Sequence, residues 1–353
     1  MKSGIYIHIP FCKKKCSYCA FVSGNFSHTE EYFEMLKREL EEFLPKSKPD
    51  TLYIGGGTPS FVGLEKIKSI TSMVNSGRKG KIEETTIEMN PDSVSEELVK
   101  GLINEGINRF SLGVQSTDNV VLKRLGRVYS KSAVFKAMEI LRKHSKNISI
   151  DIIWGIPERK ADLSIIDIFK PEHVSTYLLT IEPETKFFND GFKQKSDKFV
   201  EREYYHILEF LYKRKYLRYE VSNFSIEGYQ SKHNLLYWNT ENVYYGFGVS
   251  ACSYYNSIRS CNTQSYEKYI KDFKADRNTE NIDLNTSLFE KIMLGMRKTE
   301  GIKEEGECYA KINHEAVSLQ IERGYLIRKN GRIYFSDAGF LIMNGILADI
   351  IKD

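Results

Sequence analysis

Three cysteines stand close together near the amino end of the chain, at Cys12, Cys16 and Cys19, in the spacing C-x3-C-x2-C. A disulfide would pair two of them and leave the third alone. A structural zinc ion needs four ligands, commonly from two C-x2-C pairs. Thiolates are the usual protein ligands of iron–sulfur clusters, and three of them leave one iron of a four-iron cube open. The spacing therefore favours an iron–sulfur cluster over zinc or inert thiols, and an open iron indicates chemistry rather than scaffolding.

The cysteine run, with the aromatic Tyr18 inside it, resembles the signature of radical S-adenosylmethionine (SAM) proteins. The preceding segment Tyr6–Phe11 narrows the resemblance to the family of oxygen-independent coproporphyrinogen III oxidases. That family has two branches, the decarboxylating oxidases and the HemW-type proteins, which are regarded as haem chaperones. The resemblance covers nearly the whole chain. It implies a [4Fe-4S] cluster held by Cys12, Cys16 and Cys19, a bound SAM and, in the HemW branch, haem.

Length and composition set broad limits. With 353 residues the chain can form one large domain with an appendage, or two domains. The hydrophobic fraction of 41% is ordinary for a packed soluble protein, and the net charge of +4 indicates no particular partner. No apolar run is long enough to span a bilayer and the amino end lacks a signal-peptide core, so we expect a cytoplasmic protein without a transmembrane segment. There all six cysteines are expected to be reduced, which favours a metal or catalytic role for the clustered three.

The first half of the chain alternates strand-like and helix-like segments, which predicts a parallel sheet with right-handed crossovers. The predicted strands cover Ile5–Ile9, Thr51–Gly55, Thr85–Met89, Arg109–Val114, Ser149–Trp154 and His173–Leu179. The predicted helices cover Glu30–Leu44, Leu64–Asn75, Ser95–Glu105, Lys131–Lys143 and Leu163–Phe169. The pattern does not separate an open doubly wound α/β sheet from a partial barrel. The family resemblance implies the partial (β/α)6 barrel of radical SAM proteins.

The pattern changes after Pro183. A charged helix is predicted over Glu201–Arg214, and a tyrosine-rich region follows it. The tail predicts helices over Leu288–Lys298 and Ile312–Arg323, a hairpin that turns at Asn330-Gly331, and a last helix capped by Ser336 that runs to Ile350. We therefore expect a smaller α+β C-terminal domain with a winged-helix-like element, which acts as a lid or partner surface. It lacks a dense Lys/Arg stripe, so we expect no nucleic-acid binding.

These patterns divide the chain into three predicted parts. They are a radical SAM core barrel over residues 1–190, a barrel extension over 191–280 and the C-terminal domain over 281–353. The first of these carries the predicted cluster and SAM site.

Glycines and polar residues gather where the predicted strands end, and ligands of parallel β/α folds collect at that edge. The run from Gly55 to Pro59 resembles the radical SAM GGGTP motif, whose glycines let backbone groups approach a ligand closely. Glu88 and Asp151 lie at strand ends, where burial of a carboxylate without a partner is costly. An ion pair or a helix cap is the ordinary explanation of such a residue, as the alternative to a ligand contact. The resemblance gives these cofactor-binding candidates: Gly56, Gly57, Thr58, Glu88, Gln115, Arg127 and Asp151. Tyr6 is a further candidate because it lies beside the cysteine loop. No residue is assigned a catalytic role.

The run from His233 to Trp238 matches the HNxxYW motif of the HemW branch. Most single histidines are ordinary core or surface residues. This one precedes aromatic side chains that can stack on a flat macrocycle, and imidazole is a common axial ligand of haem iron. His233 is therefore the candidate haem ligand.

The two branches differ at one position of the cysteine loop. The oxidases carry a further cysteine two residues after the third cluster ligand, where this chain has Phe21. We therefore predict a radical SAM haem chaperone that takes up haem and delivers it to a haemoprotein, with an electron donor as a further partner. The alternative is an oxygen-independent coproporphyrinogen III oxidase, an enzyme that decarboxylates a porphyrinogen. A zinc-stabilised α/β binding protein is the third interpretation.

Overall fold

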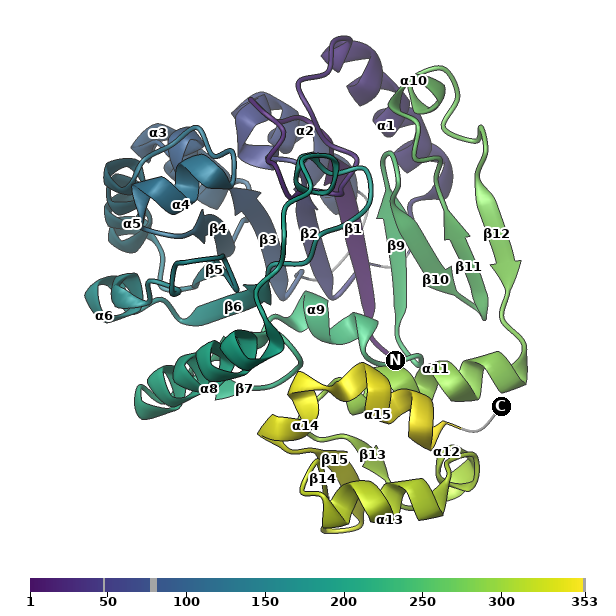
Figure 1. The fold of residues 1–353 in the computed structure, drawn as a ribbon. Helices are drawn as coiled ribbons and strands as arrows, with labels where there is room; N and C mark the ends of the chain where they lie inside the picture. Colours follow the sequence, from purple (N-terminus) through teal and green to yellow (C-terminus); the bar gives the residue numbers. More distant parts are fainter. Residues whose placement is uncertain (47, 77–80, 352–353) are drawn as a thin grey trace.

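The computed structural model describes residues 1–46, 48–76 and 81–351. At its centre six strands run parallel and pair in chain order, with helices covering their outer face (Figure 1). The strands are β1 (Ser3–Ile9), β2 (Thr51–Gly56), β3 (Glu84–Met89), β4 (Arg109–Gln115), β5 (Ile148–Trp154) and β6 (His173–Leu178). The helices between them are α1 (Thr29–Phe43), α2 (Leu64–Asn75), α3 (Glu96–Asn104), α4 (Asn119–Arg124), α5 (Lys131–His144) and α6 (Ser164–Phe169), with 3₁₀ turns η1 (Pro59–Val62) and η2 (Pro91–Ser93).

The predicted alternation of six parallel strands with helices is confirmed. Apolar residues of β1, β2 and α1 that are fully buried, such as Ile5, Leu52 and Leu36, form the layer between sheet and helices. The sheet does not stop at six strands. Its order is β12-β11-β10-β9-β1-β2-β3-β4-β5-β6-β8-β7, and β9 is parallel to β1 while the remaining added strands are antiparallel to their neighbours.

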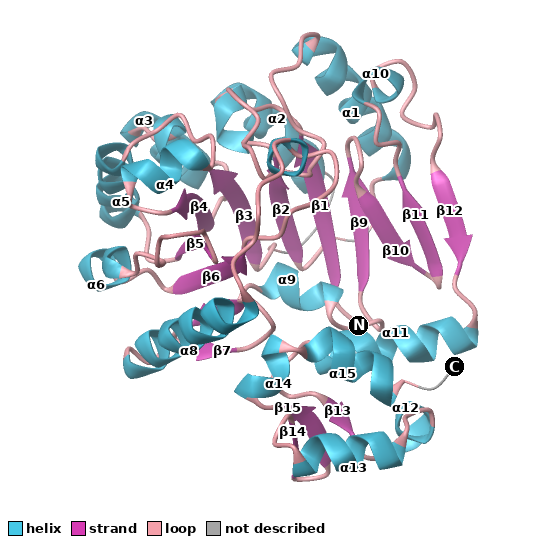
Figure 2. Ribbon diagram, viewed as in Figure 1, coloured by secondary structure: helices cyan, strands magenta, loops and turns pink. Residues whose placement is uncertain are grey.

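The second half of the chain supplies these added strands, one long helix and several short ones (Figure 2). Of these elements, the sequence pattern predicted the long helix α8 alone. The strands are β7 (Leu217–Arg218), β8 (Asn223–Ser225), β9 (Val243–Phe247), β10 (Cys252–Tyr255), β11 (Ile258–Cys261) and β12 (Asn278–Asn281). The helices are α7 (Lys186–Asn189), α8 (Asp197–Lys213), α9 (Lys232–Tyr237) and α10 (Tyr266–Tyr269). The strands are two to five residues long, too short for alternation of apolar and polar residues to reveal them.

Helix α9 crosses the amino ends of β1 and β2, at the opposite end of the strands from the cysteine loop (Figure 1). The buried carboxylate of Glu84, the first residue of β3, accepts hydrogen bonds from the backbone N–H groups of Lys232 (3.0 Å) and His233 (2.9 Å). These are donors that the first turn of a helix leaves without partners. The helix that carries the HNxxYW motif is thus fixed to the base of the barrel.

The last part of the chain packs around a hydrophobic core of its own, which includes Ile292, Val317 and Phe335. Its elements are α11 (Leu284–Met296), β13 (Ile302–Lys303), α12 (Gly306–Ala310), α13 (His314–Glu322), β14 (Leu326–Lys329), β15 (Arg332–Phe335), α14 (Asp337–Leu341) and α15 (Met343–Ile350). The hairpin turn is confirmed: Asn330 and Gly331 have φ of 53° and 68°, as a type I′ turn requires. The single last helix was wrong, because Ile342 separates α14 from α15.

The separate core and this order of helices and strands agree with the predicted C-terminal domain, whereas its winged-helix-like character and the domain boundaries at 190 and 280 stay predictions. Among the described residues, no helix has both the length and the apolar character needed to cross a bilayer.

The expectation that all six cysteines are thiols was wrong for two of them. Cys252 and Cys261 form a disulfide between β10 and β11. The two residues face each other in the antiparallel register, with Cα atoms 4.0 Å apart, so the pairing of the strands brings the sulfur atoms together. Cys12, Cys16, Cys19 and Cys308 are free.

Candidate functional site

The three clustered cysteines lie on a loop that backbone hydrogen bonds tie to its surroundings. The N–H groups of Gly57 and Thr58 donate to the carbonyls of Ile9 (2.7 Å) and Phe11 (2.9 Å), joining the loop to the end of β2. Further along, the Ser17 N–H donates to Leu125 at the end of α4 (3.0 Å). The loop is therefore held from two sides, which fixes the direction of its thiols.

His8 fastens the return of the same loop. Its Nε2–H donates to the carbonyl of Val22 (2.9 Å), which leaves Nδ1 to accept from the Tyr6 hydroxyl (2.9 Å). Burial lowers the pKa of His8 to about 4, so the ring is neutral near pH 7 and this tautomer is stable. Tyr6, a cofactor-binding candidate, acts here as a support of the loop through His8.

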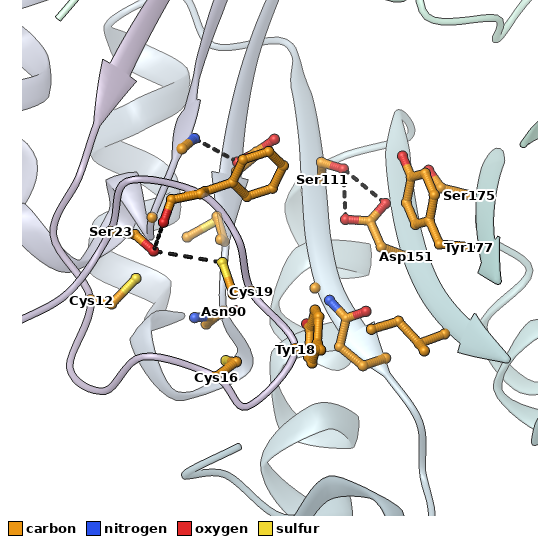
Figure 3. Close-up of a pocket in the computed structure, with 18 of the residues that line it drawn as sticks. Cys12, Cys16, Tyr18, Cys19, Ser23, Asn90, Ser111, Asp151, Ser175 and Tyr177 are labelled. Carbon is orange, nitrogen blue, oxygen red and sulfur yellow. Dashed lines mark hydrogen bonds between the residues drawn. The ribbon is translucent and has the colours of Figure 1, made fainter. Parts of the chain in front are cut away.

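The cysteines line one wall of a cavity of about 370 Å³ at the carboxyl ends of the strands, and Asp151, Ser175 and Tyr177 line the opposite wall (Figure 3). Most predicted site residues meet in this cavity: Cys12, Cys16, Cys19, Gly56, Gly57, Glu88, Gln115, Arg127 and Asp151. Thr58 lies just behind, where its hydroxyl contacts the Cys12 sulfur (3.5 Å), accepts from Asn90 Nδ2 (2.8 Å) and lines a neighbouring cavity of about 270 Å³.

The thiols occupy an enclosed environment. Burial raises the pKa of Cys12 and of Cys16, and the positive charge of Arg127 opposes the rise at Cys16. Without a metal these two sulfur atoms hold their protons near pH 7. Metal binding must release those protons, so loading of the site is expected to improve as the pH rises.

The glycine run permits a close approach between the cysteine loop and β2. A Cβ on Gly57 would lie 2.8 Å from the Phe11 carbonyl oxygen and 2.9 Å from the Cys12 sulfur. Gly56 has a φ of 115°, and a Cβ there would meet the His8 ring at 2.8 Å. These glycines are therefore required by the protein itself, in addition to any backbone contact with a ligand.

Glu88 is held by two donors at the end of β3. The Tyr53 hydroxyl donates to Oε1 (2.7 Å) and the Gly56 N–H donates to Oε2 (2.9 Å). Enclosure in the cavity raises the pKa of Glu88 to about 7, against the effect of these hydrogen bonds, and the negative charge of Asp151 adds to the rise. Burial likewise raises the pKa of Asp151, which accepts long hydrogen bonds from the Ser111 hydroxyl (3.4 and 3.5 Å).

Arg127 and Gln115 close the cavity near the cysteine loop. Arg127 donates to Asn90 Oδ1 (2.9 Å) and to the Tyr18 hydroxyl, and its guanidinium lies over the Tyr18 ring. Its Nε is buried and has no hydrogen-bond partner. Gln115 has a φ of 62° where β4 ends. A positive φ strains the backbone of a residue other than glycine, and such strain is common at functional sites.

His233 is placed apart from the cavity. The residue is 1% exposed, and its ring stacks on the Tyr53 ring at 5.1 Å and is hydrogen-bonded at both nitrogens, to Thr51 Oγ1 (2.7 Å) and to the Tyr237 hydroxyl (2.9 Å). Burial lowers its pKa to about 3. Both nitrogens are engaged, so ligation of a haem iron in this conformation would cost His233 one of its bonds. Its role as a haem ligand stays a prediction, and its contacts are those of a support under Tyr53.

Several cavity residues were not predicted: Tyr53, Asn90, Arg109, Ser111, Ser175, Tyr177 and Asn234. Most lie on strands whose bounds were predicted, at positions that alternate with buried apolar residues. Arg109, Ser111 and Gly113, for example, share the face of β4 toward the cavity. The period of two along each strand was the signal that could have found them.

Comparison with known proteins identifies relatives over the full chain. Residues 6–167 match the model of the radical SAM superfamily. The haem chaperone HemW of Lactococcus lactis is 33% identical, covering 99% of this chain and 97% of the relative. That of Bacillus subtilis is 32% identical over the whole of both chains. Among solved structures, the coproporphyrinogen III oxidase HemN of Escherichia coli, a radical SAM enzyme, covers 98% of this chain and 89% of its own with a TM-score of 0.84. Its identity is 17%, so this likeness concerns the fold alone.

Proposed function

Because this chain belongs to the HemW family of radical SAM proteins, we propose that it is a haem chaperone, which binds haem and passes it to haemoproteins. The observation that carries the proposal is identity of 32–33% over 99–100% of the chain with relatives named haem chaperones. Phe21, which is 67% exposed at the rim of the cavity, stands where the oxidases have a further cysteine. This substitution favours the chaperone over the oxidase.

The cysteine loop fits a [4Fe-4S] cluster. Cys12, Cys16 and Cys19 are free, converge on one cavity and lie on a loop fixed by backbone hydrogen bonds. In the described part of the chain, no three His, Cys, Asp or Glu side chains are close enough to share one metal ion. A four-iron cube needs no such group, because each thiolate binds a different iron. We assign the three thiolates as its ligands.

The cavity beside the cysteines also fits SAM. Bound together, the cluster and SAM supply one-electron chemistry. The residues of this chain orient the ligand: Gly56 and Gly57 offer unhindered backbone, Glu88 and Asp151 are acceptors for hydroxyl groups, and the guanidinium of Arg127 carries N–H donors for a carboxylate. Gln115, Thr58 and Tyr6 complete the proposed set, the last two through contacts with Cys12 and His8.

A haem titration on anaerobically reconstituted protein tests the proposal. We expect a Soret band that saturates at one haem per chain, transfer of that haem to an apo-haemoprotein, and little or no decarboxylation of coproporphyrinogen III with SAM and a reductant. Robust formation of protoporphyrinogen without stoichiometric haem binding would identify an oxidase instead. Iron and sulfide analysis of the same preparation distinguishes a cluster from zinc.

A further inference from the structure

A buried positive charge without a partner lies in the cavity. Arg109, the first residue of β4, is 2% exposed, and its side chain lines the cavity. Its Nε has no hydrogen-bond partner, and its guanidinium makes no hydrogen bond or ion pair within 4.0 Å to any residue that the structure describes. A buried cation is normally paired, because leaving water is costly for it. The second guanidinium of the cavity, on Arg127, is by contrast bonded to Asn90 and Tyr18.

The groups around Arg109 show what it can balance. Glu88 from β3 and Asp151 from β5 line the same cavity, as do the neutral polar side chains of Tyr53, Ser111, Ser175, Tyr177 and Asn234. Two nearby histidines carry no charge near pH 7: burial lowers the pKa of His233 to about 3 and that of His173 well below its ordinary value. With both carboxylates ionised, Glu88 and Asp151 balance the positive charges of Arg109 and Arg127, which line the same cavity. Arg127 already has hydrogen-bond partners in Asn90 and Tyr18, so the two carboxylates are the natural counter-charges of Arg109.

We propose that Arg109 is a positioning residue that keeps the Glu88 and Asp151 carboxylates ionised, so that both accept hydrogen bonds from the hydroxyl groups of a bound nucleoside. The inference rests on the SAM site of the proposed function and adds a residue to it. An ionised carboxylate offers acceptors at both oxygens, whereas a protonated one must also place a donor. Glu88 already receives the Tyr53 hydroxyl and the Gly56 N–H, so its ionised form, with an acceptor site left on each oxygen, is the better acceptor for further hydroxyl groups.

The electrostatics of Glu88 agree with this assignment. Burial and the charge of Asp151 raise its pKa, and Arg109 is the cation that opposes the rise. The titratable and charged groups that face Glu88 come from every element packed against it, and they are Tyr6, Tyr53, Arg109, Asp151, Tyr177 and Tyr237. Burial raises the pKa of each of these tyrosines, so none of them is charged near pH 7. Loss of Arg109 should then raise the pKa of Glu88 further, by up to about one unit.

The test measures SAM binding as a function of pH, by equilibrium titration of the cluster-loaded full chain. For Arg109→Met we expect affinity up to about fivefold weaker near pH 7, a midpoint of the pH profile higher by up to about one unit, and recovery toward the wild-type affinity at alkaline pH. Arg109→Lys keeps the charge and should keep the wild-type profile. Glu88→Gln should bind weakly at every pH. A loss of affinity in Arg109→Met that is the same at every pH would overturn the proposal, since a purely structural role predicts that outcome.

A second measurement needs no SAM. The infrared band of the protonated Glu88 carboxyl group is assigned by its absence in Glu88→Gln. As the pH is raised, this band should persist to a higher pH in Arg109→Met than in the wild type. If the wild type binds no SAM, the SAM site of the proposed function fails while this band still tests Arg109. If neither Arg109→Met nor Arg109→Gln folds by circular dichroism, the wild type decides: a protonated Glu88 band that persists to about pH 8.5 contradicts the proposal.

Discussion

Replacement of His233 by asparagine tests what the HNxxYW motif does in the folded chain. Asparagine keeps a hydrogen-bonding group within reach of Thr51 and leaves the Tyr237 hydroxyl without its present partner. An unpaired buried hydroxyl costs about 1–3 kcal/mol, and the lost ring, which stacks on Tyr53, leaves a small cavity. We therefore expect the free energy of unfolding near pH 7.5 to fall by about 2–4 kcal/mol.

The size of this loss should depend on pH. Burial lowers the pKa of His233 to about 3 in the folded chain, whereas the unfolded chain has a histidine pKa of about 6.5. Below about pH 6.5 the unfolded state binds a proton that the folded state does not, so the wild type loses stability as the pH falls. From about pH 7.5 to pH 5 this loss is about 2 kcal/mol for one such group. The variant side chain does not titrate, so its difference from the wild type should shrink to about 0–2 kcal/mol at pH 5.

Urea unfolding of the full chain at both pH values, followed by tryptophan fluorescence, measures the difference. Buried carboxyl groups with raised pKa values, such as Glu88 and Glu220 at about 7, change the stability with pH in the opposite direction. Both proteins contain them, so their effect cancels in the difference between variant and wild type. His206→Asn, at an exposed position of α8, is the matched control and should change nothing at either pH. An equal loss at both pH values would refute the reasoning, because it would mean that His233 reaches solvent, as a free haem ligand must. Retained haem binding by the His233 variant would separately remove this residue as the axial ligand.

Three further outcomes follow from local contacts. Cys16→Ala should lower iron and sulfide after anaerobic reconstitution by more than half, whereas Cys308→Ala, outside the cavity, should leave both unchanged. Gly57→Ala should cost about 2–3 kcal/mol of stability by urea unfolding and lower the iron content, because its Cβ would meet the Cys12 sulfur at 2.9 Å; Gly345→Ala in α15, where nothing lies within 4 Å, should be neutral or slightly stabilising. Double replacement of the Cys252–Cys261 pair by serine should cost about 2–3 kcal/mol in oxidising buffer and little in dithiothreitol, by the same assay.

The sequence alone predicted the elements of the barrel because each strand is a short apolar run that ends in a turn signal. It placed the site at the strand ends for the same reason, and the cavity there brings together residues as distant in the chain as Cys12 and Asp151. It missed the added strands, which are only two to five residues long and depend on pairing with distant partners. It also missed the break at Ile342, where an apolar run continues through a residue with non-helical backbone angles (φ −118°, ψ 22°).

Arg109 and His233 show a different limit. In the sequence, Arg109 stands at the start of an apolar strand, which is typical of an exposed charged residue at a strand end. The structure shows that its side chain is enclosed in the cavity that Glu88 and Asp151 also line. The HNxxYW motif predicted a haem ligand at His233, and that role stays a prediction. The sequence did not indicate the contacts that the structure gives this residue, with the Tyr53 ring and the Tyr237 hydroxyl, which depend on the position of α9 at the base of the barrel.

The glycine run and the HNxxYW motif are both linked to the Glu88 carboxylate. Glu88 receives one hydrogen bond from the backbone of Gly56, in the glycine run at the end of β2, and one from Tyr53, whose ring stacks on His233 at the other end of the strands. The glycine run holds the cysteine loop, so the position of Glu88 is tied to the cluster on one side and to α9 on the other. A displacement of α9 must therefore move or release Tyr53, and with it one of the two donors that fix the carboxylate. Changes at His233 in the HNxxYW motif should thus weaken SAM binding even though its ring is placed apart from the cavity.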